Sequence, residues 1–116
     1  MNVEIFLDKL NNTPESIEFS DTMAVIEQTY DFTETAFTNG DLENAAGENS
    51  GSCKLFAFAR LQKLDPQQTL ACFGAYYRDE VLLQPDADNH QNIRHFMKTA
   101  WRGIQFSSEP LTLKKN

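Results

Sequence analysis

The most apolar segment of the chain is Cys53-Lys54-Leu55-Phe56-Ala57-Phe58-Ala59-Arg60-Leu61-Gln62-Lys63-Leu64. Its apolar side chains are distributed almost all round a helix instead of along one stripe. A helix with this distribution is buried on every side and belongs in the middle of a bundle. The segment therefore predicts a central helix over residues 53–64, with the other elements packed around it.

Four further helices are predicted by apolar residues spaced three and four apart. Residues 2–11 and a segment that begins near Ser20 or Asp21 precede the central helix. Asp65-Pro66-Gln67-Gln68 and Asp88-Asn89-His90-Gln91 each place an acidic N-cap three residues before a glutamine, which is a capping-box arrangement. These two patterns predict that the last two helices begin directly after Asp65, running to about Leu83, and directly after Asp88.

The fold class predicted from these patterns is mainly α, a compact bundle of about five helices. Ala36-Phe37-Thr38 and Gln105-Phe106-Ser107 have extended character and are expected to pair as a small two-stranded β patch. The 116-residue length and the absence of a repeat favour a single domain over residues 1–116. An apolar content of 41% is typical of a globular core and argues against a disordered chain.

Charge is distributed unevenly along the chain. Residues 1–53 carry eleven acidic side chains and one basic side chain, a net charge of −10, whereas residues 54–116 carry a net charge of +3. An acidic half repels phosphate backbones, so we expect no nucleic-acid partner. No stretch approaches the roughly 20 apolar residues of a membrane span, and the first eight residues contain acids instead of a cationic leader. We therefore expect no membrane partner either.

Metal and cofactor sites find little support in the sequence. Cys53 and Cys72 lie in apolar stretches at a spacing that matches no zinc motif, and we interpret them as buried free thiols, with a disulfide or metal pair as the alternative. Asp86-Ala87-Asp88-Asn89-His90 resembles the start of a calcium loop. However, Gln91 stands where that loop needs glycine, and Met97 stands where it needs a bidentate acid. We expect no metal and no cofactor.

The first candidate site is the long polar loop from Asn39 to Ser52, which leads into the central helix. Ser52 is expected to cap that helix, and helix N-termini attract anions because free N–H groups and the helix dipole point outward there. With Lys54 nearby, Ser50-Gly51-Ser52 forms a cradle suited to a phosphate or a carboxylate. The loop lacks the GK[ST] ending of a P-loop, and the alternative is a solvated loop with an ordinary cap.

The last predicted helix carries two histidines and a basic stripe. His90 and His95 are not spaced to share a helix face, and no Ser or Cys has a recognisable nucleophile setting. Arg94, Lys98 and Arg102 recur every fourth residue on the outer face. They form either a solvated face or a docking face for an acidic partner or for the chain's own acidic half.

Five segments of the chain together carry a distinctive set of polar and aromatic residues. They are Phe37-x-Asn39-Gly40, Ala46-Gly47-x-Asn49-x-Gly51-Ser52-Cys53-Lys54-x-Phe56-Ala57-Phe58-Ala59, Thr69-Leu70-x-x-Phe73-Gly74-x-Tyr76-Tyr77-Arg78, His90-Gln91-Asn92-Ile93-Arg94-x-Phe96 and Ile104-x-Phe106. Together they resemble the HopJ type III effector family over nearly the whole chain, residues 1–111. The resemblance implies a bacterial protein named after an effector that plant pathogens inject through a type III system. It brings no enzymatic activity, cofactor or catalytic residue with it.

The polar part of this pattern falls on the loop and on the start of the last helix, which favours a site there. The candidate binding residues are Asn39, Asn49, Ser52, Lys54, His90 and Arg94. We expect an effector-like binding or interaction protein of unidentified molecular activity, with a protein partner or a small anionic ligand. The alternative is a small cytoplasmic enzyme or ligand-binding protein whose polar site lies at the same place. No catalytic residue is identified.

The amino-terminal residues bear on the expected location. Type III secretion signals are generally polar and disordered, whereas residues 3–10 have the apolar spacing of an amphipathic helix, with Glu4 and Asp8 among them. We therefore expect a cytoplasmic bacterial protein, with secretion into a host cell by a type III system as the alternative.

Overall fold

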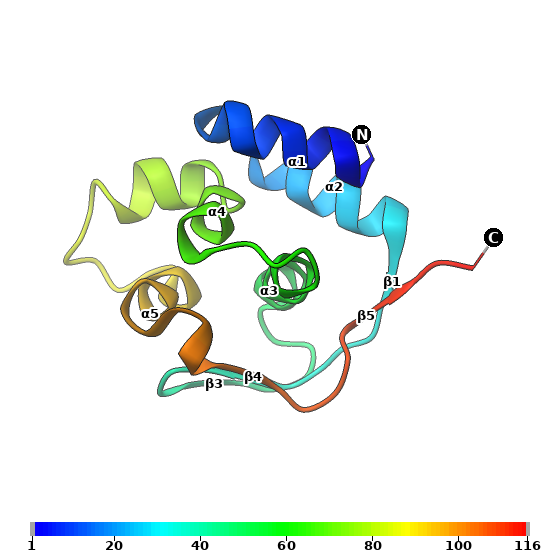
Figure 1. The fold of residues 1–116 in the computed structure, drawn as a ribbon. Helices are drawn as coiled ribbons and strands as arrows, with labels where there is room; N and C mark the ends of the chain where they lie inside the picture. Colours follow the sequence, from blue (N-terminus) through cyan, green and yellow to red (C-terminus); the bar gives the residue numbers. More distant parts are fainter. Residues whose placement is uncertain (1, 116) are drawn as a thin grey trace.

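Helix α3 (Ser50–Leu61) forms the centre of the molecule. The structure, a computed structural model, describes residues 2–115. Figure 1 shows α3 along its axis, with α1 (Val3–Asn12) and α2 (Phe19–Thr29) above it and the strands below and to the right. The other helical elements are η1 (Pro14–Ser16), α4 (Pro66–Ala71), the π-helix η2 (Tyr76–Val81), α5 (Gln91–Thr99) and η3 (Ala100–Gly103).

Two antiparallel sheets are present within residues 2–115. Strand β1 (Tyr30–Phe32) pairs with β5 (Leu111–Leu113). Strand β2 (Phe37–Asn39) lies between β3 (Leu42–Asn44) and β4 (Ile104–Phe106). The expected pairing of residues 37–38 with residues 105–106 is present in this second sheet.

The predicted fold class is wrong. Helices make up 54% of residues 2–115, and five strands in two sheets over the same residues make the protein an α/β mixture, not a mainly α bundle with a two-stranded patch. Residues 39–52 were expected to form a long polar loop, but Leu42–Asn44 is a strand because the chain reverses at Gly40, where φ is +62°. Each strand is three residues long, too short to show the alternation that identifies a strand in a sequence.

The core is built around aromatic rings that surround Phe56 on α3. Phe56 is fully buried, and its ring centroid lies 5.0 Å from Phe96, 5.5 Å from Phe73, 6.2 Å from Phe37 and 6.4 Å from Trp101. These partners come from α5, the turn after α4, β2 and η3. The predicted central helix is therefore confirmed, although it begins at Ser50 instead of Cys53.

Residues 66–83 do not form the single helix that was expected. Helix α4 ends at Ala71, and Gly74 has a φ of +62°, a conformation that favours glycine. A Cβ at Gly74 would lie 2.7 Å from the backbone nitrogen of Phe19 and 3.0 Å from the carbonyl oxygen of Ile17. The break therefore lets the start of α2 pack directly on the chain at Gly74.

We expect Phe56→Ala to lower the free energy of unfolding by about 3–5 kcal/mol, because a large cavity would open where the rings of the core meet. Ile5→Ala is the matched control, since Ile5 is 55% exposed and should change stability by less than about 0.5 kcal/mol. Urea unfolding followed by circular dichroism measures both values. Similar losses for the two variants would contradict the central position of Phe56.

Candidate functional site

A cavity of about 370 Å³ opens between the first turns of α3 and α5. Its apolar lining consists of Phe19, Leu42, Phe73, Tyr76 and Ile93. Its polar lining consists of Asn49, Gly51, Ser52, His90, Gln91 and Asn92. Apolar walls with a few converging polar groups are typical of small-ligand sites, and the volume falls in their usual range of roughly 300–1,000 Å³.

Both helices that open onto the cavity begin in the same unusual way. The N-cap residues Asn49 and His90 have left-handed backbones, with φ values of 51° and 52°, and neither side chain caps its helix. An ordinary N-cap residue has an extended backbone, and its side chain accepts a hydrogen bond from the first turn. The first turns of α3 and α5 therefore keep donor N–H groups that no capping side chain satisfies, at the positive ends of two helix dipoles.

His90 is held against the π-helix. Its Nε2 lies 2.8 Å from Oε1 of Glu80, and its ring centroid lies 5.2 Å from that of Tyr76. A carboxylate only accepts hydrogen bonds, so Nε2 of His90 is the donor of this contact when Glu80 is ionised. Glu80 and Tyr76 both belong to η2, and π-helical turns occur frequently at functional sites. The cavity thus contains a histidine whose orientation is fixed by a carboxylate.

Four asparagines join the two helix starts to the sheet. Asn39 Nδ2 donates to the carbonyl oxygen of Asn92 at 2.7 Å, and Asn92 Nδ2 donates to Asn44 Oδ1 at 3.0 Å. Asn49 Nδ2 also donates to Asn44 Oδ1, at 2.7 Å. Asn39, Asn44 and Asn92 are buried, so these bonds form in surroundings where a lost partner is costly. The network holds Asn49 and Asn92, two polar residues of the cavity lining, against the buried side chain of Asn44.

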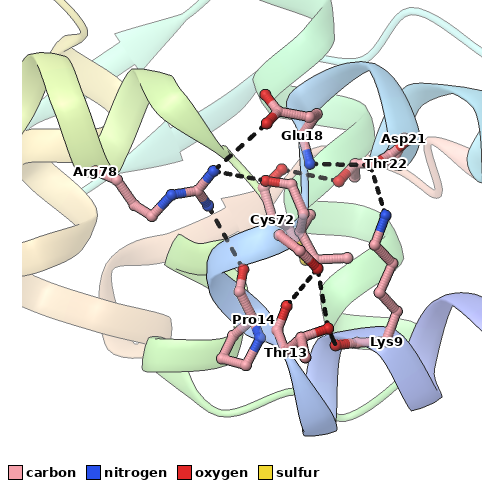
Figure 2. A network of polar contacts seen from close by, with 10 residues as sticks. Lys9, Thr13, Pro14, Glu18, Asp21, Thr22, Cys72 and Arg78 are labelled. Carbon is pink, nitrogen blue, oxygen red and sulfur yellow. Dashed lines mark hydrogen bonds and ion pairs between the residues drawn. The ribbon is translucent and has the colours of Figure 1, made fainter.

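A polar network around Arg78 holds the chain directly before Phe19. Arg78 Nη2 donates to the carbonyl oxygen of Ile17 at 2.9 Å and lies 3.8 Å from Oε1 of Glu18. Figure 2 shows the guanidinium reaching from η2 toward Glu18 on one side and Pro14 on the other. These contacts fix the start of α2, and with it the Phe19 wall of the cavity.

The aromatic wall is ordered by its own contacts. The rings of Phe19 and Phe73 are stacked, with centroids 6.2 Å apart and planes 13° apart, and Tyr76 lies edge-on to Phe19 at 5.3 Å. Thr22, one turn along α2, donates to the carbonyl oxygen of Cys72 at 2.8 Å (Figure 2). The wall is therefore tied to both α2 and the segment after α4.

Three of the six candidate residues predicted from the sequence lie together. Asn49, Ser52 and His90 all line the cavity. Asn39 is fully buried behind the cavity, in contact with Asn92, and its Oδ1 has no hydrogen-bond partner within residues 2–115. It supports the site without reaching the cavity surface.

The two basic candidates lie elsewhere. Lys54 Nζ is 3.8 Å from Oε1 of Glu27 and 5.0 Å from the centre of the Phe32 ring, so it faces α2 and β1. Arg94 donates to the carbonyl oxygen and side chain of Asn89 and to the carbonyl oxygen of Pro85, which closes the loop before α5. Neither residue lines the cavity between α3 and α5.

Several residues that line the cavity or contact its lining were not predicted from the sequence. Phe73 and Tyr76 were assigned to a continuous helix, and Glu80 and Asn44 were not singled out. Tyr76 and Asn92 do lie in segments that resemble the HopJ family. That resemblance was the one signal in the sequence that pointed to them.

Two kinds of feature are absent from residues 2–115. No group of three or more His, Cys, Asp or Glu side chains there is arranged to hold a metal ion. Among the helices of the same residues, none has the length and apolar character needed to cross a membrane.

We expect Asn92→Ala to lower the free energy of unfolding by about 1–3 kcal/mol, because buried Asn44 Nδ2 would lose its contact with Asn92 Oδ1 and Asn44 Oδ1 would keep only the donor of Asn49. Asn12→Ala removes an exposed asparagine from the end of α1 and should change stability by less than about 0.5 kcal/mol. Denaturant unfolding of both variants tests the network. Equal stabilities would show that the buried bonds contribute nothing.

The two cysteines are buried free thiols, as the sequence analysis interpreted them. Burial raises the pKa of Cys53 to about 11 and that of Cys72 to about 12, with a smaller opposing effect from the Thr22 hydrogen bond to Cys72. Because only the thiolate reacts with disulfide reagents, we expect no thiol titration by Ellman's reagent at about pH 8 in the folded protein. Both thiols should react in denaturant, and rapid reaction of the folded protein would contradict their burial.

Comparisons with known proteins agree with this architecture. The family model described as HopJ type III effector protein matches residues 3–111. A crystal structure described as that of the unknown function protein VPA0580 is 59% identical, with a TM-score of 0.97 over 98% of this chain and 95% of that chain. A comparison with curated proteins found no match. Since the family model spans nearly the whole chain, the protein belongs to the HopJ family.

Proposed function

We propose that the protein binds a small ligand with an anionic group and an aromatic or apolar part, in the cavity between α3 and α5. The observation that carries this proposal is the meeting of two uncapped helix starts at one cavity. A single helix start attracts carboxylates and phosphates weakly in water, but two that act on the same group provide several N–H donors and two dipoles.

The rest of the lining supports the same ligand chemistry. The stacked pair of Phe19 and Phe73, with Tyr76 beside it, offers flat apolar surface against which a ring or chain packs. His90 contributes a proton donor when its imidazole is charged, and Glu80 keeps the ring in position. Ser52 adds a hydroxyl that both donates and accepts hydrogen bonds.

The positive character of this cavity does not depend on lysine. Lys54 is paired with Glu27, so the anion is proposed to interact with backbone N–H groups, His90 and the Ser52 hydroxyl. This matters for selectivity, since the whole chain carries a net charge of −7 and repels anions at a distance. A ligand with substantial apolar surface overcomes that repulsion more readily than a bare inorganic ion.

An effector-like interaction role and a cytoplasmic location are broader proposals. The family description names a type III effector, which supports action on a partner and is compatible with secretion into a host cell. A cytoplasmic location stays our prediction, and secretion is the alternative.

The ligand proposal is tested with a panel of aryl phosphates, aryl carboxylates and neutral aryl alcohols. We expect phenyl phosphate to raise the melting temperature and to bind with a Kd on the order of 0.1–1 mM, while benzyl alcohol has no effect. His90→Asn should weaken binding about tenfold, because asparagine tolerates the left-handed backbone but removes the imidazole.

His95→Asn is the matched control, since His95 also belongs to α5 and does not line the cavity. It should leave the Kd of phenyl phosphate within about twofold. The proposal fails if no anionic aryl compound binds, or if both histidine variants weaken binding equally.

A further inference from the structure

A second cavity, of about 460 Å³, lies between the end of the π-helix and the outer face of α5. Its apolar lining includes Leu82, Met97 and the buried Val81. Arg94 and Lys98 contribute positive charge to the lining. It shares only Gln91 with the cavity described above. It is therefore a separate surface, and nothing in the proposed ligand site requires it.

Apolar exposure is concentrated around this second cavity. Leu82 is 47% exposed and Met97 is 45% exposed, and both line the cavity. They are two of the seven large apolar residues exposed in residues 2–115. Apolar side chains gathered beside a concave surface and edged by polar groups are typical of a protein-interaction site.

The charge of the same surface is not neutralised by the chain. Within residues 2–115, four of the ten basic side chains form an ion pair with an acid: Lys9, Lys54, Arg78 and Lys114. Lys98 is among the six described basic side chains that form none. Arg94 donates only to uncharged oxygens, although Asp86 and Asp88 lie in the loop that it closes. On a chain of net charge −7, these two residues keep a local positive charge.

We propose that this surface docks an acidic amphipathic segment of a partner protein. Apolar side chains of that segment would enter between Leu82 and Met97, and its carboxylates would meet Arg94 and Lys98. Apolar anchors three and four residues apart are the usual way in which a helix occupies such a groove. The overall negative charge of the chain keeps acidic partners away from other surfaces, so the complementary charge also orients the encounter.

Two other occupants are less suited to the surface. An anionic bilayer is flat and does not fill a concave cavity, and it would repel the acidic residues of the first half of the chain. A second copy of this chain offers α1, which carries Glu4, Asp8 and the exposed Ile5. That helix already packs Phe6 and Leu10 in the core, so it has a single exposed apolar anchor in place of a row of them.

The test uses a fluorescein-labelled peptide of about 16 residues with leucines at helical spacing and glutamates between them. Fluorescence anisotropy with the full chain should show saturable binding with a Kd on the order of 1–100 μM. A peptide with lysine in place of every glutamate should bind at least about tenfold more weakly. Absence of saturable binding, or equal binding of the two peptides, overturns the proposal.

Matched variants locate the contact. Leu82→Asp and Lys98→Glu should each weaken peptide binding at least about tenfold, whereas Leu113→Asp and Lys115→Glu should stay within about twofold of the unchanged protein. Leu113 is an exposed leucine like Leu82, but it lies on β5 and does not line the cavity. Circular dichroism confirms that each variant is folded, and equal effects of the two pairs contradict the assignment.

Two further measurements separate the alternative occupants. Binding to phosphatidylglycerol vesicles without binding to the acidic peptide would assign the surface to a membrane and overturn the proposal. Self-association of the chain in sedimentation, abolished by Lys98→Glu, would assign it to a second copy with the same consequence. We expect neither result.

Discussion

Phe56 packs against aromatic rings that come from four separate parts of the chain, and this contact organises the molecule. The middle of α3 has no side that faces solvent, because Leu55 to Ala59 are all buried. A helix buried in this way has to be covered completely. The other helices cover only part of it, and the two small sheets contribute Phe37 and Leu111 to the remaining sides of the core. The two sheets therefore cover the sides of α3 that the other helices leave open.

The same arrangement explains where a site forms. A central helix reaches the surface only at its ends, and the first turn of α3 emerges beside the first turn of α5. Asn49 and His90 hold left-handed backbones there, and the buried asparagines keep the two turns together. Backbone conformations of this kind cost free energy and are concentrated at functional sites. Of the four non-glycine residues with positive φ within residues 2–115, Asn49 and His90 line the cavity for which we propose a ligand.

The sequence predicts which segments are helical more accurately than it predicts the residues at which each helix begins and ends. The capping box of Asp65 and Gln68 is present as expected, since it depends only on residues three apart. The start of α5 differs, because Gln91 donates to the carbonyl oxygen of Asp88 and His90 becomes the N-cap. The predicted basic stripe of Arg94, Lys98 and Arg102 is also interrupted. Ala100 has a φ of 52°, so Arg102 does not continue the helix that carries Arg94 and Lys98.

Three of the six candidate residues predicted from the sequence line the cavity, and Asn39, Lys54 and Arg94 do not. Lys54 was expected beside Ser52 because the two residues are close in sequence. Two residues along a helix differ in direction by roughly 200°, so the Lys54 side chain points away from the cavity that Ser52 lines. Phe73, Tyr76 and Glu80 were hidden because Gly74 and the π-helix change their direction in ways that spacing does not show. Such residues depend on contacts between distant segments, which composition and periodicity do not contain.

The central claim is that the first turns of α3 and α5 together bind an anionic group. Titration of the ¹⁵N-labelled protein with phenyl phosphate, followed through backbone amide resonances, tests it most directly. We expect the amides of Gly51, Ser52, Gln91 and Asn92 to show the largest saturable shifts. Binding of the anion at these two helix starts is contradicted if those amides do not move up to about 10 mM ligand, or if the largest shifts fall near Lys98 and Arg102.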